Sequence, residues 1–247
     1  MLLSYDIEIS DLFEVAEGED WSKFAPFHIS VAATAEHAED GEELHWHGVK
    51  EDGTPTTSLD AAEAKRLLLY LREKQKAGVK VCAWNGLSFD LRWIGWNAGD
   101  FALAREVALA SYDPMFQFFC IKGFPVSLAS VGKGFGIEQK KLMTGDKAPL
   151  EWANGNFDLV KAYVLGDCQI TNQVVAEIER RHCVSWITKK GKPQSVAMPR
   201  LKTVAECIAE PFFADQSWMD EPMRKEGFYE WFKEAETQAC EEDECPF

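Results

Sequence analysis

The stretch LLSYDIEI, residues 2–9, decides the fold of this chain. Polar and apolar side chains alternate along it, which predicts a strand with one face in a core. Asp6 and Glu8 then point to the same side, where two carboxylates repel each other and burial increases the repulsion. A divalent cation removes this cost, because Mg²⁺ and Mn²⁺ prefer oxygen ligands. An exposed edge strand with solvated acids is the alternative, and the apolar neighbours of the two acids weaken it.

The composition is that of an ordinary globular protein, with 46% hydrophobic and 27% charged residues. No apolar run is long enough to span a membrane, and no secretory signal opens the sequence. We therefore expect an intracellular, cytoplasmic protein with no membrane partner. The seven cysteines are an odd number without zinc-site spacing, so we expect them to be reduced and mostly buried. Cys240 and Cys245, in the acidic tail, are weak evidence for a metal site.

The net charge of −15 is distributed unevenly. Residues 1–63 contain 16 acidic and 2 basic residues, and residues 230–247 contain 7 acidic and 1 basic, whereas residues 64–229 contain 23 basic and 18 acidic. A nucleic-acid surface depends on local patches and not on the total charge. The candidate basic patches are Lys140-Lys141, Arg180-Arg181 and the run at 189–192. Each patch taken alone is better explained as a solvated face.

The order of predicted elements indicates a mixed sheet with helices on its faces, an α/β fold. Strands are predicted at 2–9, 27–36 and 44–49, as an antiparallel meander, and a buried fourth strand at 79–84. Helices are predicted at 60–78, 88–99, 101–109, 127–137 and 156–182. A short strand or irregular segment is expected near Asp113. Residues 183–247 form an extension whose structure the sequence leaves open.

Two further carboxylates stand at positions typical of functional sites. Asp90 follows the strand at 79–84, where sites collect in α/β proteins, although an acid in the first turn also suits the helix dipole. Tyr163 and Asp167 are four residues apart and share one helix face, and a Tyr–Asp contact without chemistry is the alternative. Gly166 is unfavourable inside a helix, which indicates close approach of another backbone or of substrate.

These residues resemble a known family. Asp6-x-Glu8, the stretch NGLSFD ending in Asp90, and Tyr163-x-x-x-Asp167 are similar to the three exonuclease motifs of the DEDD superfamily, in the same order. The tyrosine resembles that of the DEDDy branch, which includes the proofreading domains of family B DNA polymerases. Each motif alone is common, but three in order on the expected elements are hard to obtain by chance.

The resemblance implies an RNase H-like fold, with an antiparallel meander plus parallel strands flanked by helices. It covers about residues 1–182, which we expect to form a 3′–5′ exonuclease domain. SLASVGKGFGIEQKK, residues 127–141, also looks like a helix of that family. Residues 183–247 are expected to pack on the domain and to end in an acidic tail.

The resemblance also implies a two-metal hydrolysis that releases nucleoside 5′-monophosphates, with two Mg²⁺ or Mn²⁺ ions about 3.5–4 Å apart. Asp6 is expected to bridge both ions, and Glu8 and Asp167 to hold the ion that activates water. Asp90 is expected to hold the other ion. Tyr163 is expected to orient the attacking water without removing its proton, since a phenol of pKa about 10 is a poor base at neutral pH.

Substrate contacts are predicted at four further positions. Asn85 stands where the second motif of the family has an asparagine. Ile9 departs from the threonine or small residue that often follows the first motif, beside the terminal nucleotide. Leu12 and Phe13 are candidates for a wedge and a stacking platform against the last base, and ordinary core packing explains them equally well.

The expected substrates are single-stranded DNA or RNA 3′ ends, because the acidic N-terminal quarter disfavours nonspecific duplex binding. DNA is favoured over RNA, and a role in DNA repair is expected. The extension is a possible site for a protein partner. One alternative is a catalytically inactive RNase H-like module that binds nucleic acid or a partner, and another is an interaction protein with surface acids. His45 and His47 are a further candidate metal pair, although two histidines without a third ligand are more often hairpin surface. The oligomeric state is not indicated.

Overall fold

The computed structural model describes residues 1–14, 21–138 and 142–235. The acidic tail at 236–247, with Cys240 and Cys245, lies outside these residues, and so does the Lys140-Lys141 pair. The described cysteines are all free, as expected. None of the described helices has the length and apolar character needed to cross a membrane.

A mixed four-stranded sheet is the centre of the molecule, with strand order β3-β2-β1-β4. The strands are β1 (Leu2–Ile9), β2 (Ile29–Glu36), β3 (Glu43–Trp46) and β4 (Lys80–Cys82). β1 pairs antiparallel with β2, and β2 antiparallel with β3, whereas β4 pairs parallel with β1. The predicted α/β fold with a mixed sheet is confirmed, although β3 and β4 are both shorter than the sequence indicated.

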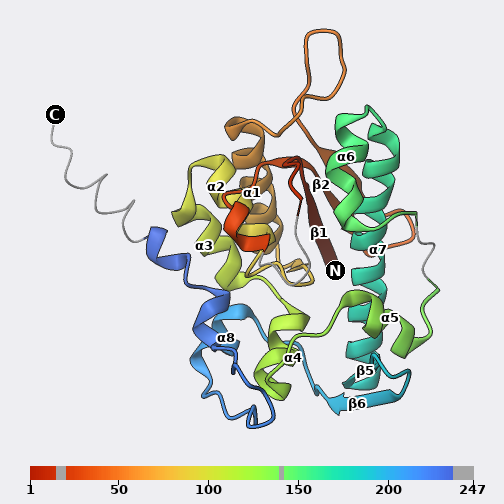
Figure 1. Ribbon diagram of the computed structural model, residues 1–247, viewed down its shortest axis with the longest axis vertical. Coiled ribbons are helices and arrows are strands. Elements are labelled where there is room, and N and C mark those ends of the chain that lie inside the picture. The colour runs from red at the N-terminus through yellow and green to blue at the C-terminus, as the bar shows by residue number, and fades with distance from the viewer. Residues whose placement is uncertain (15–20, 139–141, 236–247) are drawn as a thin grey trace, which may run out of the picture.

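Helices cover both faces of this sheet (Figure 1). α1 (Ala61–Lys76), α2 (Asp90–Ala98) and α3 (Phe101–Ala110) lie on one side, and α6 (Ala148–Ala153) and α7 (Phe157–Arg181) on the other. The strand alternation in β1 decides which residues face which layer. Leu3, Tyr5 and Ile7 alternate along β1, are at most 4% exposed, and pack in the main core with α1 to α3, and Ile9 lies partly buried against the same core. The even-numbered residues of β1, including Asp6 and Glu8, therefore face α7.

The helix boundaries follow the capping signals of the sequence. Asp60 caps α1 by accepting a hydrogen bond from the Glu63 amide at 2.8 Å, and the chain leaves that helix near Gly78, whose φ is +80°. Ser127 caps α5 (Leu128–Phe135) in the same way, accepting from the Ser130 amide at 3.2 Å. The helices predicted at 60–78 and 127–137 begin at these two caps.

The segment near Asp113 differs from the prediction. Residues 114–122 form the helix α4 (Pro114–Lys122), and the Asp113 carboxylate caps it by accepting from the Phe116 amide at 3.0 Å. Strand-like pairing is limited to Tyr112, in isolated bridges to Cys82 and Thr203. The reason is local, because a proline at the first helical position is preset for a helix and needs no amide partner.

The C-terminal segment is built on the other elements. The hairpin β5 (Cys183–Ile187) and β6 (Pro193–Ala197) packs on α5, and α8 (Val204–Ala209) packs on α3 and α4. Trp231 is buried in the main core, and its indole N–H donates to the Leu87 carbonyl at 2.8 Å. Three short 3₁₀ helices complete the described chain: η1 (Trp21–Phe24), η2 (Gly145–Lys147) and η3 (Lys225–Phe228).

Candidate functional site

Buried polar contacts fix the position of α7 on the sheet. The Ser4 hydroxyl donates to Asn172 Oδ1 at 2.7 Å, and Asn172 Nδ2 donates to the Ala35 carbonyl at 2.9 Å. The Cys168 thiol donates to the Ala33 carbonyl at 3.4 Å. A buried polar group that loses its partner costs about 1–3 kcal/mol, so these contacts disfavour any sliding of the helix along β1 and β2.

This register brings Asp167 to Asp6. Asp6 lies two strand residues beyond Ser4, about 7 Å along β1. Asp167 lies five helix residues before Asn172, about 7.5 Å along α7. The two distances are nearly equal. Because β1 and α7 run in opposite directions, both acids also lie on the same side of the contact between Ser4 and Asn172.

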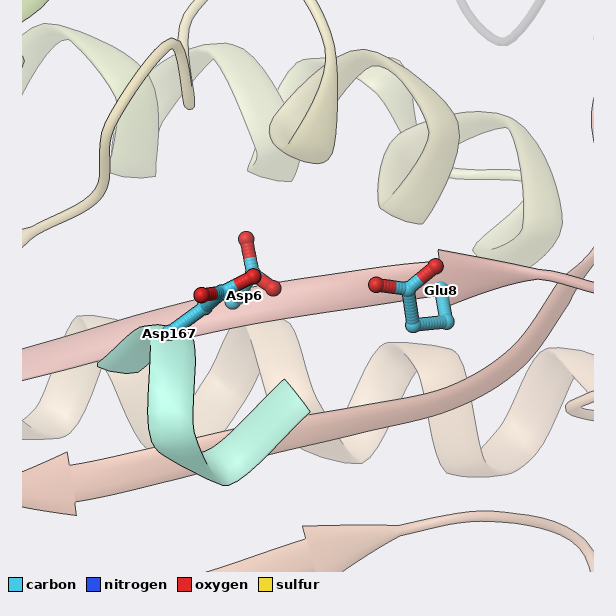
Figure 2. Close-up of side chains that lie close together, drawn as sticks. All are labelled: Asp6, Glu8 and Asp167. Carbon is cyan, nitrogen blue, oxygen red and sulfur yellow. The ribbon is translucent and has the colours of Figure 1, made fainter. Parts of the chain in front are cut away.

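Three carboxylates meet where β1 faces α7. One carboxylate oxygen each from Asp6, Glu8 and Asp167 lies within 4.8 Å of the other two. Figure 2 shows Asp6 and Glu8 on the strand and Asp167 on the helix beside it. Among the described residues, no other group of three or more histidine, cysteine, aspartate or glutamate side chains is placed to hold a metal ion. The donor set consists of oxygen atoms alone, which suits Mg²⁺ or Mn²⁺ better than Zn²⁺.

Asp90 contacts β1 along the edge of the strand on which β4 pairs. β4 pairs with β1 only as far as Ser4, so the later residues of β1 have no strand partner on that side. Asp90, which is 2% exposed, fills this gap by accepting a hydrogen bond from the Ile7 amide at 3.1 Å. The acid at the start of α2 is therefore more than a partner for the helix dipole, because it joins α2 to the strand that carries Asp6 and Glu8.

A second buried carboxylate, Asp113, holds the turn that precedes α2. It accepts from the backbone amides of Asn85 at 3.1 Å and Leu87 at 3.0 Å. Between them, a Cβ on Gly86 would lie 2.7 Å from the Tyr5 hydroxyl, so only glycine fits there without a shift. The turn that leads to Asp90 is thus fixed by a residue that sequence reasoning missed.

The electrostatics of the site favour protonated acids when no cation is present. Burial raises the pKa of Asp6, and the charges of Asp90, Asp167 and Glu8 raise it further. Burial also raises the pKa of Glu8, followed by the charges of Asp167 and Asp90. The pKa of Asp90 rises to about 8, first because of burial and then because of the neighbouring charge of Asp113. A cation in the site would replace these protons and favour the ionised carboxylates.

Tyr163 completes the group from the preceding turn of α7. Its hydroxyl donates a hydrogen bond to the Asp167 carboxylate, which opposes the increase in the Asp167 pKa that burial causes. Burial, followed by the charges of Asp167, Glu8 and Asp6, raises the pKa of Tyr163 above its ordinary value. The phenol is therefore neutral at physiological pH and acts as a donor.

The four predicted substrate positions lie in the turn before α2, at the end of β1 and on the chain that follows β1. Asn85 has a φ of +73°, and its side-chain oxygen accepts from the Ser88 hydroxyl at 2.6 Å, within the turn before α2. Ile9 is partly buried against the main core. Leu12 is 61% exposed, and Phe13 stacks on Phe24 with ring centroids 4.5 Å apart.

His45, in β3, and His47, just after it, belong to no cluster of metal ligands within the described chain. His45 Nε2 contacts the Lys161 carbonyl of α7 at 3.0 Å, and His47 Nδ1 contacts the Gly48 carbonyl at 3.0 Å. Among the residues that the structure describes, no third metal-binding side chain stands beside them. His45 instead adds another contact between the sheet and α7.

The two described basic patches differ in how their charges are used. Arg180 and Arg181 both pair with Glu177, so their charge is locally compensated. The lysines of the other patch are exposed on the turn between β5 and β6 and form no ion pair with a described residue: Lys189, Lys190 and Lys192.

A cavity of about 520 Å³ adjoins the acidic group. It lies between α5, residues 142–145 and α7, and both Tyr163 and Asp167 line it. Its other walls are mainly apolar, with Leu128, Ile137 and Ile170 among them. Nothing in the spacing of these residues indicated a shared cavity, because they come from three separate segments.

The comparisons with known proteins add no family. The chain matches no protein-family model and no curated protein sequence.

Proposed function

We propose that this protein is a metal-dependent 3′–5′ exonuclease with an RNase H-like fold. It hydrolyses the 3′-terminal phosphodiester of single-stranded nucleic acid, with DNA favoured over RNA, and releases nucleoside 5′-monophosphates. The observation that carries the proposal is the cluster of Asp6, Glu8 and Asp167, with Tyr163 and Asp90 near it, from three separate elements. The strand order β3-β2-β1-β4, with β4 parallel to β1, supports the RNase H-like assignment.

The residues fit a pair of divalent cations. Asp6, Glu8 and Asp167 offer oxygens from one side, and Asp90 stands on the next edge of the same strand. The elevated pKa values of these acids indicate a site whose negative charge has no counter-charge within the described chain. When bound, two such ions activate a water molecule and stabilise charge on the attacking and leaving oxygens.

Each side chain then has a defined task. Asp6 would bind both ions, and Glu8 and Asp167 would hold the ion that activates the attacking water. Asp90 would hold the ion that stabilises the leaving 3′ oxygen, and the hydrogen bond that it accepts from the Ile7 amide orients its carboxylate. The Tyr163 hydroxyl is protonated and donates to Asp167, so its oxygen is left to accept a hydrogen bond from the attacking water; Tyr163 thus orients the nucleophile and does not act as the base.

Charge and shape favour a single strand over a duplex. The first quarter of the chain is strongly acidic, which repels the dense phosphate charge of duplex nucleic acid. The lysines at the tip of the β5–β6 turn offer unpaired positive charge to a phosphate backbone. We assign the terminal base to the chain that follows β1, where Leu12 is exposed and Phe13 stacks on Phe24.

The test is digestion of DNA and RNA oligonucleotides of matched sequence, labelled at the 3′ or the 5′ end, in Mg²⁺, Mn²⁺ or EDTA. We expect immediate release of labelled mononucleotide from the 3′-labelled strand, a ladder from the 5′-labelled strand, and no reaction in EDTA. Asp6→Asn and Asp167→Asn should each abolish hydrolysis, while Asp40→Asn on an exposed turn should leave it unchanged.

The same assay distinguishes an exonuclease from a catalytically inactive module that only binds nucleic acid. A wild-type protein that binds the oligonucleotides but releases no mononucleotide in either metal is a binding module and not an exonuclease. Hydrolysis that persists in both Asp6→Asn and Asp167→Asn would assign the activity to another site or to a contaminant.

A further inference from the structure

Gly166 stands in the interior of α7, one residue before Asp167, although glycine is a poor helix former. Two other α-helical glycines, in α2 and α5, have a packing reason. A Cβ at Gly95 would lie 2.7 Å from the Ala104 Cβ, and one at Gly134 would lie 2.3 Å from the Ser185 carbonyl oxygen. A Cβ at Gly166 would meet nothing within 4 Å. No backbone of the described chain approaches it, so close packing does not explain the glycine.

The empty space beside Gly166 belongs to the cavity of about 520 Å³. Tyr163, Gly166 and Asp167 line it from α7, together with Ile170. The volume lies within the range of about 300–1,000 Å³ that is typical of small-molecule sites. Apolar side chains make up much of the wall: Leu128, Ile137, Leu142, Met143 and Ile170. Apolar walls of this kind suit the flat face of a base and the carbon atoms of its sugar. The cations that the neighbouring acids would hold suit the reacting phosphodiester.

A single cation also lines this cavity among the described residues. Lys133, on α5, is exposed, and it makes no ion pair with another described residue. A chain with a net charge of −15 offers many possible partners for a lysine, so an unpaired one beside a cavity is available to an anion. Lys133 comes from α5, whereas the acids that would hold cations come from β1, α2 and α7.

We propose that Gly166 keeps open a seat for one nucleotide of a single strand, with the base and sugar against the apolar walls and a phosphate at Lys133. This inference rests on the proposed exonuclease function and adds the seat that selects an unpaired nucleotide. A base held against these walls is no longer stacked on the neighbouring bases of its strand. A paired base in a duplex would have to give up its stacking and its pairing to enter the seat. The seat therefore discriminates by strandedness and not by sequence.

The first experiment fills the seat with Gly166→Leu and uses Ala162→Leu as the matched control. Ala162 is exposed on the same helix and does not line the cavity. Hydrolysis of an eight-residue thymidine oligonucleotide is followed in Mg²⁺, together with the melting temperature. We expect Gly166→Leu to melt at or above the wild-type temperature, because leucine is the better helix former, and to lose at least tenfold in kcat/KM, mainly through KM. Ala162→Leu should stay within twofold of the wild type.

The second experiment removes the cation with Lys133→Gln, with Lys50→Gln on an exposed turn as control. The KM of the same oligonucleotide should rise about tenfold at low salt, which equals about 1.4 kcal/mol. The slope of log KM against log salt concentration should fall by about 0.7, the value for one phosphate contact on a single strand. Lys133→Arg should restore both quantities, which a purely structural role would not require.

The outcomes separate the seat from the proposed function. If the wild type releases no nucleotide in Mg²⁺ or Mn²⁺, the exonuclease proposal fails, and the seat fails with it. If the wild type hydrolyses the strand but Gly166→Leu and Lys133→Gln both match it, the function stands and the seat is refuted. If Gly166→Leu melts below the wild type, the space beside residue 166 is not open, which also refutes the inference.

Discussion

Replacing Asp90 by asparagine tests the electrostatics of the site without removing its geometry. Asparagine keeps an oxygen that accepts the hydrogen bond from the Ile7 amide, but it carries no charge and does not titrate. The folded protein raises the pKa of Asp90 from 3.8 to about 8, first through burial and then through the charge of Asp113. The variant should therefore differ from the wild type in the pH dependence of its stability.

The size of the effect follows from proton linkage. A carboxyl group that holds its proton more tightly in the folded than in the unfolded protein stabilises the fold at low pH, and this stabilisation is lost as pH rises toward the folded pKa. Within this window the free energy of unfolding falls by about 1.4 kcal/mol per pH unit. Between pH 5 and pH 8 the wild type should lose up to about 4 kcal/mol that Asp90→Asn retains. Because neighbouring acids readjust, we expect at least half of that difference, about 4–8 °C in melting temperature.

The assay is thermal unfolding of both proteins at pH 5, 6, 7 and 8 in EDTA, with Asp40→Asn as the surface control. The advantage of Asp90→Asn should widen steadily with pH, whereas Asp40→Asn should run parallel to the wild type. Added Mg²⁺ should raise the wild-type melting temperature most at pH 8, because the acids must ionise to bind it. An equal gap between Asp90→Asn and the wild type at pH 5 and pH 8 would refute the buried, charge-crowded site.

Three further predictions concern single residues. Tyr163→Phe should slow hydrolysis about 10- to 100-fold without abolishing it, and the pH–rate profile should keep its shape below pH 9, because the phenol does not titrate there. Asn172→Leu should lower the free energy of unfolding by about 1–3 kcal/mol in urea titrations, since the Ser4 hydroxyl and the Ala35 carbonyl lose their partner. Gly134→Ala should reduce stability by about 1–3 kcal/mol, because its methyl group would press on the backbone of β5, and a melt equal to the wild type would contradict this close packing.

Local patterns predicted most of the elements near the site. The alternation in residues 2–9 placed Asp6 and Glu8 on one face, and the helical spacing placed Tyr163 one turn before Asp167. The α4 helix was missed because its aromatic run has no clear period, and Asp113 was not recognised as its cap. The partners of Asp113 lie 26 and 28 residues earlier in the chain, at Leu87 and Asn85, and no local pattern reveals contacts at that separation.

The sequence by itself determined the residue types of the site and the face that each presents on its own strand or helix, since both depend only on the local period of the backbone. The tertiary structure decided whether those faces meet. Ser4 and Asn172, 168 residues apart, set the register of α7 on β1 and so bring Asp167 to Asp6. The tertiary structure also decided the role of Gly166. A glycine in a helix can allow a close contact or leave open space, and this depends on what packs beside it in the folded chain.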